Sequence, residues 1–540
     1  MDRREALRLL SRSGLGLASL SGGVPILSSC ASLRPAPIPP SPNRYGVTIL
    51  VDGLRADSFD QMLDAGALPN IQRHLAQRGT TVESCAGTFP STTGPAHLPL
   101  INGRMPGTNN CPGLRWIDRH HNIVRDYCTL ETLFFDGDFP PEAYTLYEML
   151  EGQRTVCIFD IVSRGAAEAY RPSLKTLWFS RSDSVESWRG MDEEAVDVFE
   201  RVYGEEPTPT FTFVWMPAVD HLSHLHGSTS QIVQDQIVFV DRQVGRMMEV
   251  LQRKGIYDKT LVVLTADHGL RDTERSIEIR DPLREAGFSV LRDLSGNDQF
   301  NTLMTHNAVR GVSGNGYAVL YFARKKKYRW ATWMGWEDRP TFEELRGFPL
   351  EGNGDVDLIE LLREEEAVRF VAALEVNEPD RRTVRLMTRV GDARIERDEG
   401  SEALRYAVLS GPDPLGYSDD AEASALLNGR FHHKDTWFRA TRGSSYPDAV
   451  YQVCQVFDAE RCGDIVVSST PGWDFMDQGH LASHGGLEKD ELMVPMVMAG
   501  PGVREGVTIP HARTADVYPI FLEFFGIPDL DGRLPNVFNG

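Results

Sequence analysis

The sequence predicts an α/β protein, in which a doubly wound, mostly parallel sheet carries an inserted α+β region. Three observations predict this class. Short apolar runs alternate with helical patterns through the first half of the 540-residue chain. Several of these runs end in Asp or in an Asp/His cluster, and from about residue 280 the rhythm changes to short strands between Gly- and acid-rich segments. Alternation of strands and helices is typical of a parallel sheet that is covered by helices on both faces.

The elements of the predicted sheet follow in chain order. Apolar runs predict strands at residues 45–51, 154–160, 210–216 and 260–265. Helical spacing of apolar residues predicts helices at residues 68–79, 144–151, 184–203 and 231–254. The sheet pattern resumes at 463–468, a further strand is expected at 493–499, and a last helix at 514–525. Residues 45–298 and 463–540 are therefore expected to form one core.

The segment between these two parts, residues 299–462, is predicted to be an α+β cap region. Strand-like runs occur at 316–322, 383–389 and 405–409, and a charged helical pattern covers 357–375. We expect this insertion to shape access to a site on the core.

The first thirty residues predict an export signal rather than folded structure. Arg3 and Arg4 precede a modestly apolar, Gly/Ser-rich run, as in twin-arginine signals. The run ends in Leu-Ser-Ser-Cys30, which resembles a bacterial lipobox and predicts a lipid anchor on Cys30. The alternative is an ordinary signal peptide with a chance cysteine. Residues 31–44 form a Pro-rich tether, so we expect an exported lipoprotein in the bacterial periplasm or on the outer membrane.

Composition argues against some classes of function. The formal net charge of −21 disfavours binding along nucleic-acid phosphates. A small anionic substrate stays compatible with this charge, because bound cations can dominate the local field. Six cysteines follow Cys30 and none forms a Cys-x-x-Cys pair, so we expect no sulfur-ligated zinc site.

A turn-rich stretch, Thr88-Phe-Pro-Ser-Thr-Thr-Gly-Pro-Ala-His97, carries a candidate nucleophile in Thr93. Pro95 suits the first turn of a helix, which predicts that Thr93 lies at a helix N-terminus. The free backbone N–H groups there favour a phosphate. A hydroxyl is a weak nucleophile and needs activation by a base or a metal. The alternative is an N-cap without chemistry.

Carboxylates and imidazoles at the ends of predicted strands are candidate metal ligands. In chain order they are Asp52, Asp220, His224, Asp267, His268 and His484. This mixture of oxygen and nitrogen ligands suits zinc. Asp220 and His224 are four residues apart and can share one face of a helical turn. Spacing alone does not exclude His221, His226 or His480 as ligands.

The set of motifs resembles the alkaline phosphatase superfamily, and within it the nucleotide pyrophosphatase/phosphodiesterase branch. The resemblance rests on Val51-Asp-Gly-Leu-Arg-Ala-Asp57 and on Phe89-Pro-Ser-Thr-Thr-Gly-Pro-Ala-His97 leading to Asn102-Gly103. It continues in Asp220-x-x-x-His224, Thr265-Ala-Asp-His-Gly269 and His484-Gly485. These motifs cover residue 47 to about 269, and 464 to the end.

The resemblance implies an alkaline phosphatase-like core that binds two zinc ions and reacts through a phospho-threonine. By motif, one ion would be held by Asp220, His224 and His484, and the other by Asp52, Asp267, His268 and Thr93. Two cations roughly 4 Å apart clamp the attacking and leaving oxygens of an in-line displacement. The implied reaction is hydrolysis of a phosphodiester or pyrophosphate bond in a nucleotide or lipid headgroup. The threonine nucleophile argues against the sulfatases of this superfamily.

Departures from the family pattern concern substrate binding. Ala96 stands where the family commonly has Asn, and Asn109 and Asn110 are candidates for a downstream Asn that contacts phosphate; Asn110 is the predicted substrate-binding residue. The monoesterase branch of the same superfamily grips the extra phosphate oxygens with a Lys-x-Arg pair; Arg164 matches the Arg of this pair, and Val162 stands at the Lys position. Arg164 is expected either to contact phosphate or to be a surface residue.

Three alternatives to a phosphodiesterase remain open at this point. The first is monoester hydrolysis at the same site, and the second is a phosphate-group transferase of the cell envelope. The third is a binding lipoprotein that has this fold and no catalytic activity.

Overall fold

The computed structural model describes residues 43–538 except 122, 175–180, 292–302, 353, 379–380, 399, 477 and 529–536. The predicted export signal, the lipobox with Cys30 and nearly all of the tether lie outside the described residues. Among the described helices, none has the length and apolar character that crossing a membrane requires.

The first sheet has eight strands in the order β28-β2-β27-β9-β1-β8-β6-β7. β27 is antiparallel to its neighbours β2 and β9, and the other pairs are parallel. The strands are β1 (Tyr45–Val51), β2 (Gly79–Val82), β6 (Thr155–Ile158), β7 (Glu168–Tyr170), β8 (Phe211–Met216), β9 (Thr260–Thr265), β27 (Met496–Ala499) and β28 (Val507–Ile509). The prediction of a mostly parallel α/β sheet is confirmed.

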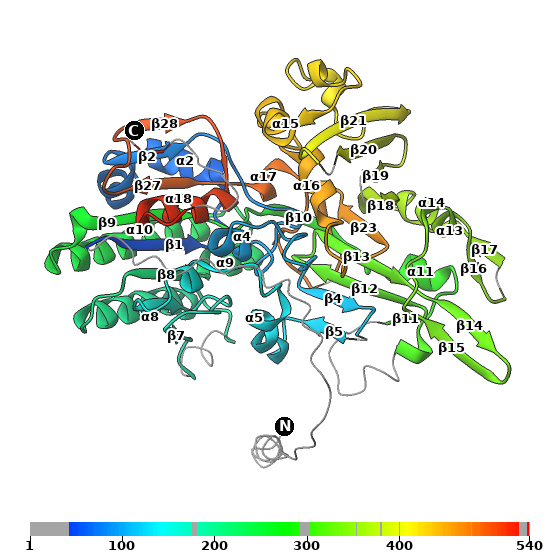
Figure 1. Cartoon of the computed structure of the whole chain (residues 1–540), viewed down its shortest axis with the longest axis horizontal. Helices are drawn as coiled ribbons and strands as arrows, with labels where there is room; N and C mark the ends of the chain where they lie inside the picture. Colours follow the sequence, from blue (N-terminus) through cyan, green and yellow to red (C-terminus); the bar gives the residue numbers. More distant parts are fainter. Residues whose placement is uncertain are drawn as a thin grey trace, which may run out of the picture. The chain divides into compact units, whose positions relative to one another are not determined.

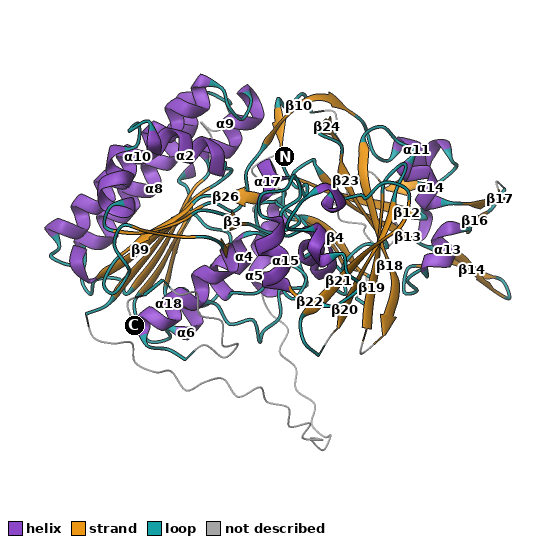
Figure 2. Cartoon of the chain, turned by 90° about the horizontal axis from the view of Figure 1, so that it is seen from above, coloured by secondary structure: helices purple, strands orange, loops and turns teal. Residues whose placement is uncertain are grey.

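Helices cover both faces of this sheet, which is why its central strands are mostly apolar and buried along nearly all of their length. Figure 2 shows α8, α9 and α10 on one face and α6 and α18 on the other. The helices of this part are α2 (Ala56–Asp64), α3 (Pro69–Ile71), α4 (His97–Asn102), α5 (Phe135–Asp138), α6 (Leu146–Met149), α8 (Val185–Gly204), α9 (Ala218–His226), α10 (Gln231–Arg253) and α18 (Val517–Phe525). The predicted helix at 68–79 is short, since α3 passes into a π-helical turn over Gln72–Ala76 and Gly79 begins β2.

The second sheet has nine strands in the order β11-β12-β13-β23-β18-β19-β20-β21-β22 (Figure 1). They are β11 (Val290–Leu291), β12 (Ala308–Ser313), β13 (Tyr317–Phe322), β18 (Val368–Glu378), β19 (Arg381–Met387), β20 (Asp392–Asp398), β21 (Ala403–Ser410), β22 (His432–His433) and β23 (Ile465–Ser469). Helices α11 (Asp281–Glu285), α13 (Phe342–Arg346), α14 (Leu358–Arg363), α15 (Lys434–Thr441) and α16 (Ala449–Val456) accompany it.

Two expectations for this region are wrong. The run at 463–468 does not return to the first sheet, because β23 pairs with β13 and β18 in the middle of the second. A short, fully buried apolar run fits the centre of either sheet, so its pattern does not identify its partners. The helical pattern at 357–375 is only half helix, since α14 ends at Arg363 and β18 begins at Val368.

Two three-stranded sheets and three strand pairs complete the described fold. In one three-stranded sheet β3 (Cys85–Ala86) lies between β26 (Met493–Val494) and β29 (Ala512–Arg513), and in the other β10 (Arg271–Ser276) lies between β24 (Gly472–Asp474) and β25 (Ala482–Ser483). The pairs are β4 (Arg115–Asp118) with β5 (Ile123–Asp126), β14 (Arg324–Tyr328) with β15 (Ala331–Gly335), and β16 (Phe348–Leu350) with β17 (Gly354–Val356). Helix α17 (Lys489–Leu492) precedes β26. The predicted strand at 493–499 is thus divided between two sheets, as β26 and β27.

The register of the central strands brings distant segments to one edge of the first sheet. Val51 of β1 pairs with Met216 of β8, and Leu50 pairs with Thr265 of β9. The residues that follow these three strands therefore leave the sheet side by side, at the carboxyl ends where open α/β sheets bind ligands.

Candidate active site

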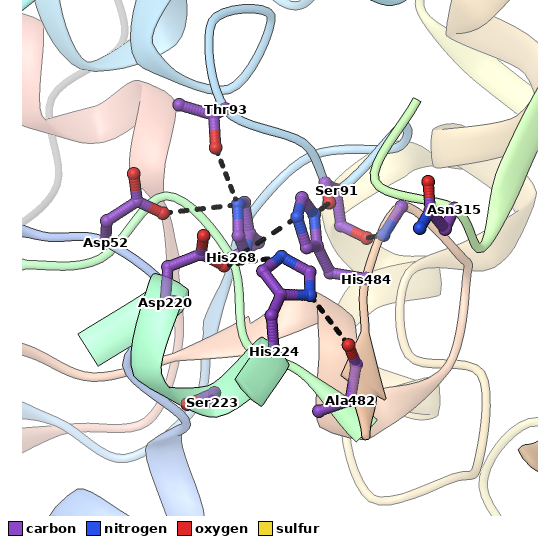
Figure 3. A network of polar contacts seen from close by, with 12 residues as sticks. Asp52, Ser91, Thr93, Asp220, Ser223, His224, His268, Asn315, Ala482 and His484 are labelled. Atoms are coloured by element: carbon purple, nitrogen blue, oxygen red, sulfur yellow. Dashed lines mark hydrogen bonds and ion pairs between the residues drawn. The ribbon is translucent and has the colours of Figure 1, made fainter. Parts of the chain in front are cut away.

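Two groups of side chains meet at this edge of the sheet (Figure 3). Asp52, Asp267 and His268 form the first group, and Asp220, His268 and His484 form the second. Within each group the ligand atoms all lie within 4.8 Å of one another. The structure therefore brings together ligand types and spacings that a divalent metal ion requires.

The first group gathers around Nε2 of His268, which follows β9. This nitrogen lies 3.2 Å from Asp267 Oδ2 and 3.4 Å from Asp52 Oδ1. The hydroxyl oxygen of Thr93 is 3.2 Å from the same nitrogen. The predicted nucleophile thus directly contacts the first group.

The second group is built on helix α9. Asp220 and His224 lie one turn apart, as expected, and Asp220 Oδ1 is 3.4 Å from His224 Nε2. His484, which follows β25, places its Nε2 3.7 Å from the same oxygen. One carboxylate oxygen thus faces two imidazole nitrogens.

Backbone carbonyls fix the tautomers of all three histidines. Nδ1 of His224 lies 2.7 Å from the carbonyl oxygen of Ala482, and Nδ1 of His484 lies 2.8 Å from the carbonyl oxygen of Ser91. In His268 it is 3.1 Å from the adjacent carbonyl of Gly269. A carbonyl only accepts, so each Nδ1 carries a hydrogen, and in the neutral ring the lone pair then lies on Nε2, which faces the carboxylates. This is the arrangement that metal-ligating histidines adopt.

Two buried oxygens support the fit of metal ions to these groups. Asp52 Oδ1 and Asp220 Oδ1 are buried and have no hydrogen-bond donor in the described part of the chain. A buried carboxylate oxygen without a donor is costly. Cations bound between the carboxylates and the free Nε2 atoms would satisfy both oxygens.

The electrostatics of the site reflect this crowding of charge. Burial and two neighbouring carboxylates raise the pKa of Asp52 above its usual range. Burial opposes ionisation of Asp220 as well, but the neighbouring His224 ring outweighs it and lowers the pKa of Asp220. Burial, followed by the charge of His268, lowers the pKa of His484 to about 3. His484 is therefore a neutral imidazole at physiological pH, as a metal ligand must be.

Thr93 does not lie at a helix N-terminus, contrary to the prediction. Helix α4 begins at His97, and Thr93 precedes it in a turn in which Gly94 has a φ of 88°. Only glycine adopts this left-handed conformation easily. The turn is joined to the His484 segment by Ser91, whose Oγ donates to the carbonyl of Gly486 at 2.8 Å.

The second sheet holds one member of the site. The turn between β12 and β13 exchanges two backbone hydrogen bonds with His484. The N–H of His484 donates to the carbonyl of Gly314 at 2.9 Å, and the N–H of Gly316 donates to the carbonyl of His484 at 2.7 Å. Gly314 has a φ of 61°, and a Cβ atom there would lie 2.5 Å from His484 Nδ1. The inserted region therefore positions His484 directly, a role that the sequence did not indicate.

Two predicted substrate-binding residues are engaged elsewhere. Asn110 Oδ1 accepts a hydrogen bond of 3.0 Å from the backbone N–H of Arg461. Arg164 donates to Glu148 Oε2 and to the carbonyls of Phe139, Pro140 and Ala143. Both side chains support local structure, and no described contact joins either of them to the metal-ligand groups.

Sequence reasoning assigned no role to two residues that contact the predicted ligands. Trp215, near the end of β8, donates from Nε1 to Asp52 Oδ2 at 2.8 Å. His97 places its Nε2 3.2 Å from Asp267 Oδ2 and its Nδ1 2.6 Å from Asp160 Oδ1. His97 stands in the Thr93 motif, and that position was the only signal for it in the sequence.

Comparison with known proteins identifies the family. The family model described as type I phosphodiesterase / nucleotide pyrophosphatase matches residues 47–491, which is most of the chain. The chain belongs to this family. The resemblance inferred from the motifs is therefore confirmed.

Three relatives of this chain are distant in sequence. Ectonucleotide pyrophosphatase/phosphodiesterase family member 3 of Mus musculus is 23% identical over 261 residues, 46% of this chain and 27% of that protein. Bis(5'-adenosyl)-triphosphatase enpp4 of Xenopus laevis is 22% identical over 260 residues, 46% of this chain and 52% of that protein. Family member 7 of Mus musculus is 25% identical over 238 residues, 41% of this chain and 48% of that protein. The chain thus spans about half, or less, of the length of these relatives.

Solved structures show the same fold. Human ectonucleotide pyrophosphatase / phosphodiesterase 5 has a TM-score of 0.55 and 13% identity, over 92% of this chain and 100% of that chain. An inactive murine variant of the same protein, in complex with AMP, has a TM-score of 0.53 and 13% identity, over 92% and 97%. At this identity the likeness shows the fold alone.

Proposed function

We propose that this chain hydrolyses phosphodiester or pyrophosphate bonds of a small phosphorylated substrate, with Thr93 as the nucleophile. One observation supports this most strongly. Thr93 Oγ1 lies 3.2 Å from His268 Nε2, the nitrogen that also faces Asp52 and Asp267. A hydroxyl beside a metal-ligand group is the arrangement that activates a weak oxygen nucleophile.

Two divalent cations, zinc by ligand type, are part of the proposal. Asp220, His224 and His484 would hold one, and Asp52, Asp267, His268 and Thr93 the other. When bound, the cations would lower the pKa of the Thr93 hydroxyl and stabilise the negative charge on the reacting phosphate. The fixed tautomers and the two donor-free carboxylate oxygens support this assignment.

The reaction of the chain's own residues proceeds in two steps. Thr93 Oγ1 bonds to phosphorus while the bond to the leaving oxygen breaks, and the hydroxyl proton ends on the leaving alcohol. Water then cleaves the Thr93–phosphate ester, restoring the hydroxyl and releasing the phosphorylated product. The Ser91 hydroxyl donates to the Gly486 carbonyl and accepts from the Gly485 N–H, and these two hydrogen bonds hold the Thr93 turn against the His484 segment.

The contacts of Arg164 favour diester over monoester substrates. A monoester carries an additional charged oxygen, and Arg164 was the residue expected to contact it. Its guanidinium instead binds Glu148 and backbone carbonyls. The AMP complex of the murine neighbour supports a nucleotide as the first substrate class to examine.

The decisive experiment compares two substrates on one enzyme preparation. Zinc-loaded protein without residues 1–42 is given bis(p-nitrophenyl) phosphate and p-nitrophenyl phosphate, with Thr93→Ala as the inactive control. The proposal expects higher kcat/KM for the diester and loss of both activities in the variant. Preferred monoester turnover would move the function to the phosphatase alternative, and unchanged activity in Thr93→Ala would exclude the proposed nucleophile.

The cellular location remains part of the proposal. We expect twin-arginine export and lipidation of Cys30, which together leave the enzyme anchored to a membrane by its N-terminus. Labelling of the expressed protein with a palmitate analogue checks this. A label that persists in Cys30→Ser would contradict the anchor.

A further inference from the structure

His97 connects the proposed metal site to a charge buried behind it. The residue begins helix α4, and its side chain is fully buried. Its Nδ1 lies 2.6 Å from Asp160 Oδ1, in the loop after β6. Its Nε2 lies 3.2 Å from Asp267 Oδ2, in the loop after β9. One imidazole thus joins two carboxylates from different strand ends.

The geometry fixes what His97 offers to each partner. An ionised carboxylate accepts hydrogen bonds and donates none. Both ring nitrogens therefore carry hydrogen, and both donate. Charge-assisted hydrogen bonds of this kind are shorter and stronger than neutral ones, in keeping with the 2.6 Å contact to Asp160.

His97 is the described side chain that compensates the burial of the Asp160 carboxylate. Its Oδ2 is buried and has no hydrogen-bond partner in the described residues, and Oδ1 bonds to His97. An unpaired buried carboxylate would be strongly unfavourable. The pair therefore gives Asp160 a hydrogen-bond partner and ties the His97 ring to the loop after β6.

Trp215 supplies the matching contact on the other carboxylate of the first group. Its Nε1 donates to Asp52 Oδ2 at 2.8 Å, and its ring packs edge-on against His97 with centroids 5.5 Å apart. Asp52 accepts this hydrogen bond on Oδ2 and turns Oδ1 towards His268, whereas Asp267 contacts His97 through Oδ2, the same oxygen that lies 3.2 Å from His268 Nε2. A donor on a ligand carboxylate limits its rotation and so orients the oxygen that would bind a cation.

We propose that His97 is a positioning residue that fixes the Asp267 carboxylate for metal binding, and that Asp160 orients His97. The inference rests on the proposed function, since it concerns the metal site. Loss of such an outer contact typically weakens metal binding by about 10–100-fold. The contact that matters is the one from Nε2 to Asp267, because it reaches the predicted ligand itself.

Two substitutions separate the two contacts of His97. In His97→Asn the amide nitrogen lies near the former Nδ1 and keeps a donor for Asp160, while the donor to Asp267 is lost. In His97→Gln the longer side chain brings its amide nitrogen near the former Nε2 and keeps the donor to Asp267. The control is His74→Asn, which removes a buried histidine whose Nδ1 contacts Tyr257 at 2.7 Å, outside the site.

The test measures zinc affinity by competition with a chromogenic chelator, together with thermal unfolding of each metal-free protein. We expect His97→Asn to weaken the affinity for one zinc ion by about 10–100-fold, and His97→Gln and His74→Asn to stay within about threefold of the wild type. A merely structural role would lower the unfolding temperature of His97→Asn without changing its zinc affinity, and that result would overturn the inference.

Two further outcomes are decisive. If His97→Asn does not fold, a tenfold or greater loss in His97→Gln would overturn the inference, because this variant keeps the contact held to be decisive. If the wild type itself binds no zinc, the proposed function fails. If the wild type binds zinc and both His97 variants bind it equally well, only the role of His97 fails.

Discussion

The imidazole rings of His268 and His484 lie parallel, with centroids 3.7 Å apart and 9° between their planes. His268 follows β9 of the first sheet, whereas His484 follows β25 and is held by the β12–β13 turn of the second. The stacked pair therefore joins the two predicted metal-ligand groups across the two sheets. The candidate site thus depends on contacts from both parts of the fold, with His484 held by the β12–β13 turn.

The hydroxyl of Thr93 is expected to be essential, and replacement by serine should be tolerated in part. Thr93→Ala removes the nucleophile and should lower kcat by about 10⁴-fold or more. Thr93→Ser keeps the hydroxyl but loses the methyl group that restricts its rotamer, so a smaller loss is expected. Steady-state kinetics with bis(p-nitrophenyl) phosphate measure both. Equal activity of the alanine and serine variants would contradict this role.

Removal of one imidazole from the second group should lower the metal content. His224→Ala takes away one of the two Nε2 atoms that face Asp220 Oδ1. We expect about one zinc ion to be lost per chain, and activity to fall with it. Elemental analysis after dialysis provides the measurement. His226→Ala, on the same helix, is the control and should keep the wild-type zinc content.

A methyl group at Gly314 should disturb His484 without touching the first sheet. The Cβ atom of Gly314→Ala would lie 2.5 Å from His484 Nδ1, in a residue whose φ is 61°. We expect weaker zinc binding and lower kcat, because His484 must shift. Gly352→Ala, where φ is 93° and the added atom meets nothing within 4 Å, is the control for backbone strain alone. Equal zinc affinity in the two variants would show that the turn does not position His484.

Arg164 should contribute to stability rather than to substrate binding. Its side chain lies over the Phe139 ring at 3.7 Å and bonds to Glu148 and nearby carbonyls. Arg164→Ala is expected to lower the free energy of unfolding by about 1–3 kcal/mol while KM for a diester stays within about twofold. Urea unfolding measures the change in stability, and steady-state kinetics measure KM. A large rise in KM at unchanged stability would restore the phosphate-binding role.

The sequence was sufficient to predict which candidate ligands lie together, because their positions depend on strand ends. Asp52, Asp267 and His268 follow buried apolar runs, and parallel strands end at a common edge. To predict that Asp220 and His224 lie close together, the four-residue spacing of a helical turn was sufficient. These residues converge in the structure, although their roles in catalysis remain a prediction.

Other features depended on contacts that no local pattern encodes. The run Ile465–Ser469 is apolar and buried, which fits either sheet, and only its pairing with β13 and β18 decides between them. Arg164 matches a motif position, but in the structure its guanidinium donates to Glu148 and to backbone carbonyls that no local pattern brings near it. His97 was visible in the motif, whereas its partner Asp160 lies 63 residues later and carries no signal of its own.

Stability should depend on pH through Asp192, a buried residue of α8. Burial raises the pKa of Asp192 to about 7, although Ala218 N–H and Gln236 donate to it. Because the folded-state pKa exceeds the unfolded value of about 4, the neutral acid is favoured by folding. This contribution is fully present below about pH 4 and is lost as pH rises towards 7, by up to about 1.4 kcal/mol per pH unit.

The comparison that isolates this effect is Asp192→Asn against the wild type. The metal-free proteins are unfolded in urea at several values between pH 4 and 8. The difference in unfolding free energy between wild type and variant should shift in favour of the variant as pH rises. A difference that is constant over this range would contradict the raised pKa.

The most direct test of the central claim is to trap the reaction on Thr93. The zinc-loaded enzyme is mixed with excess bis(p-nitrophenyl) phosphate, quenched in acid at a series of times, and digested for mass spectrometry. We predict a phosphoryl ester on the peptide that contains Thr93, and none in Thr93→Ala. An active enzyme whose Thr93 peptide stays unmodified at every time, and whose Thr93→Ala variant turns over at the wild-type rate, would contradict the account.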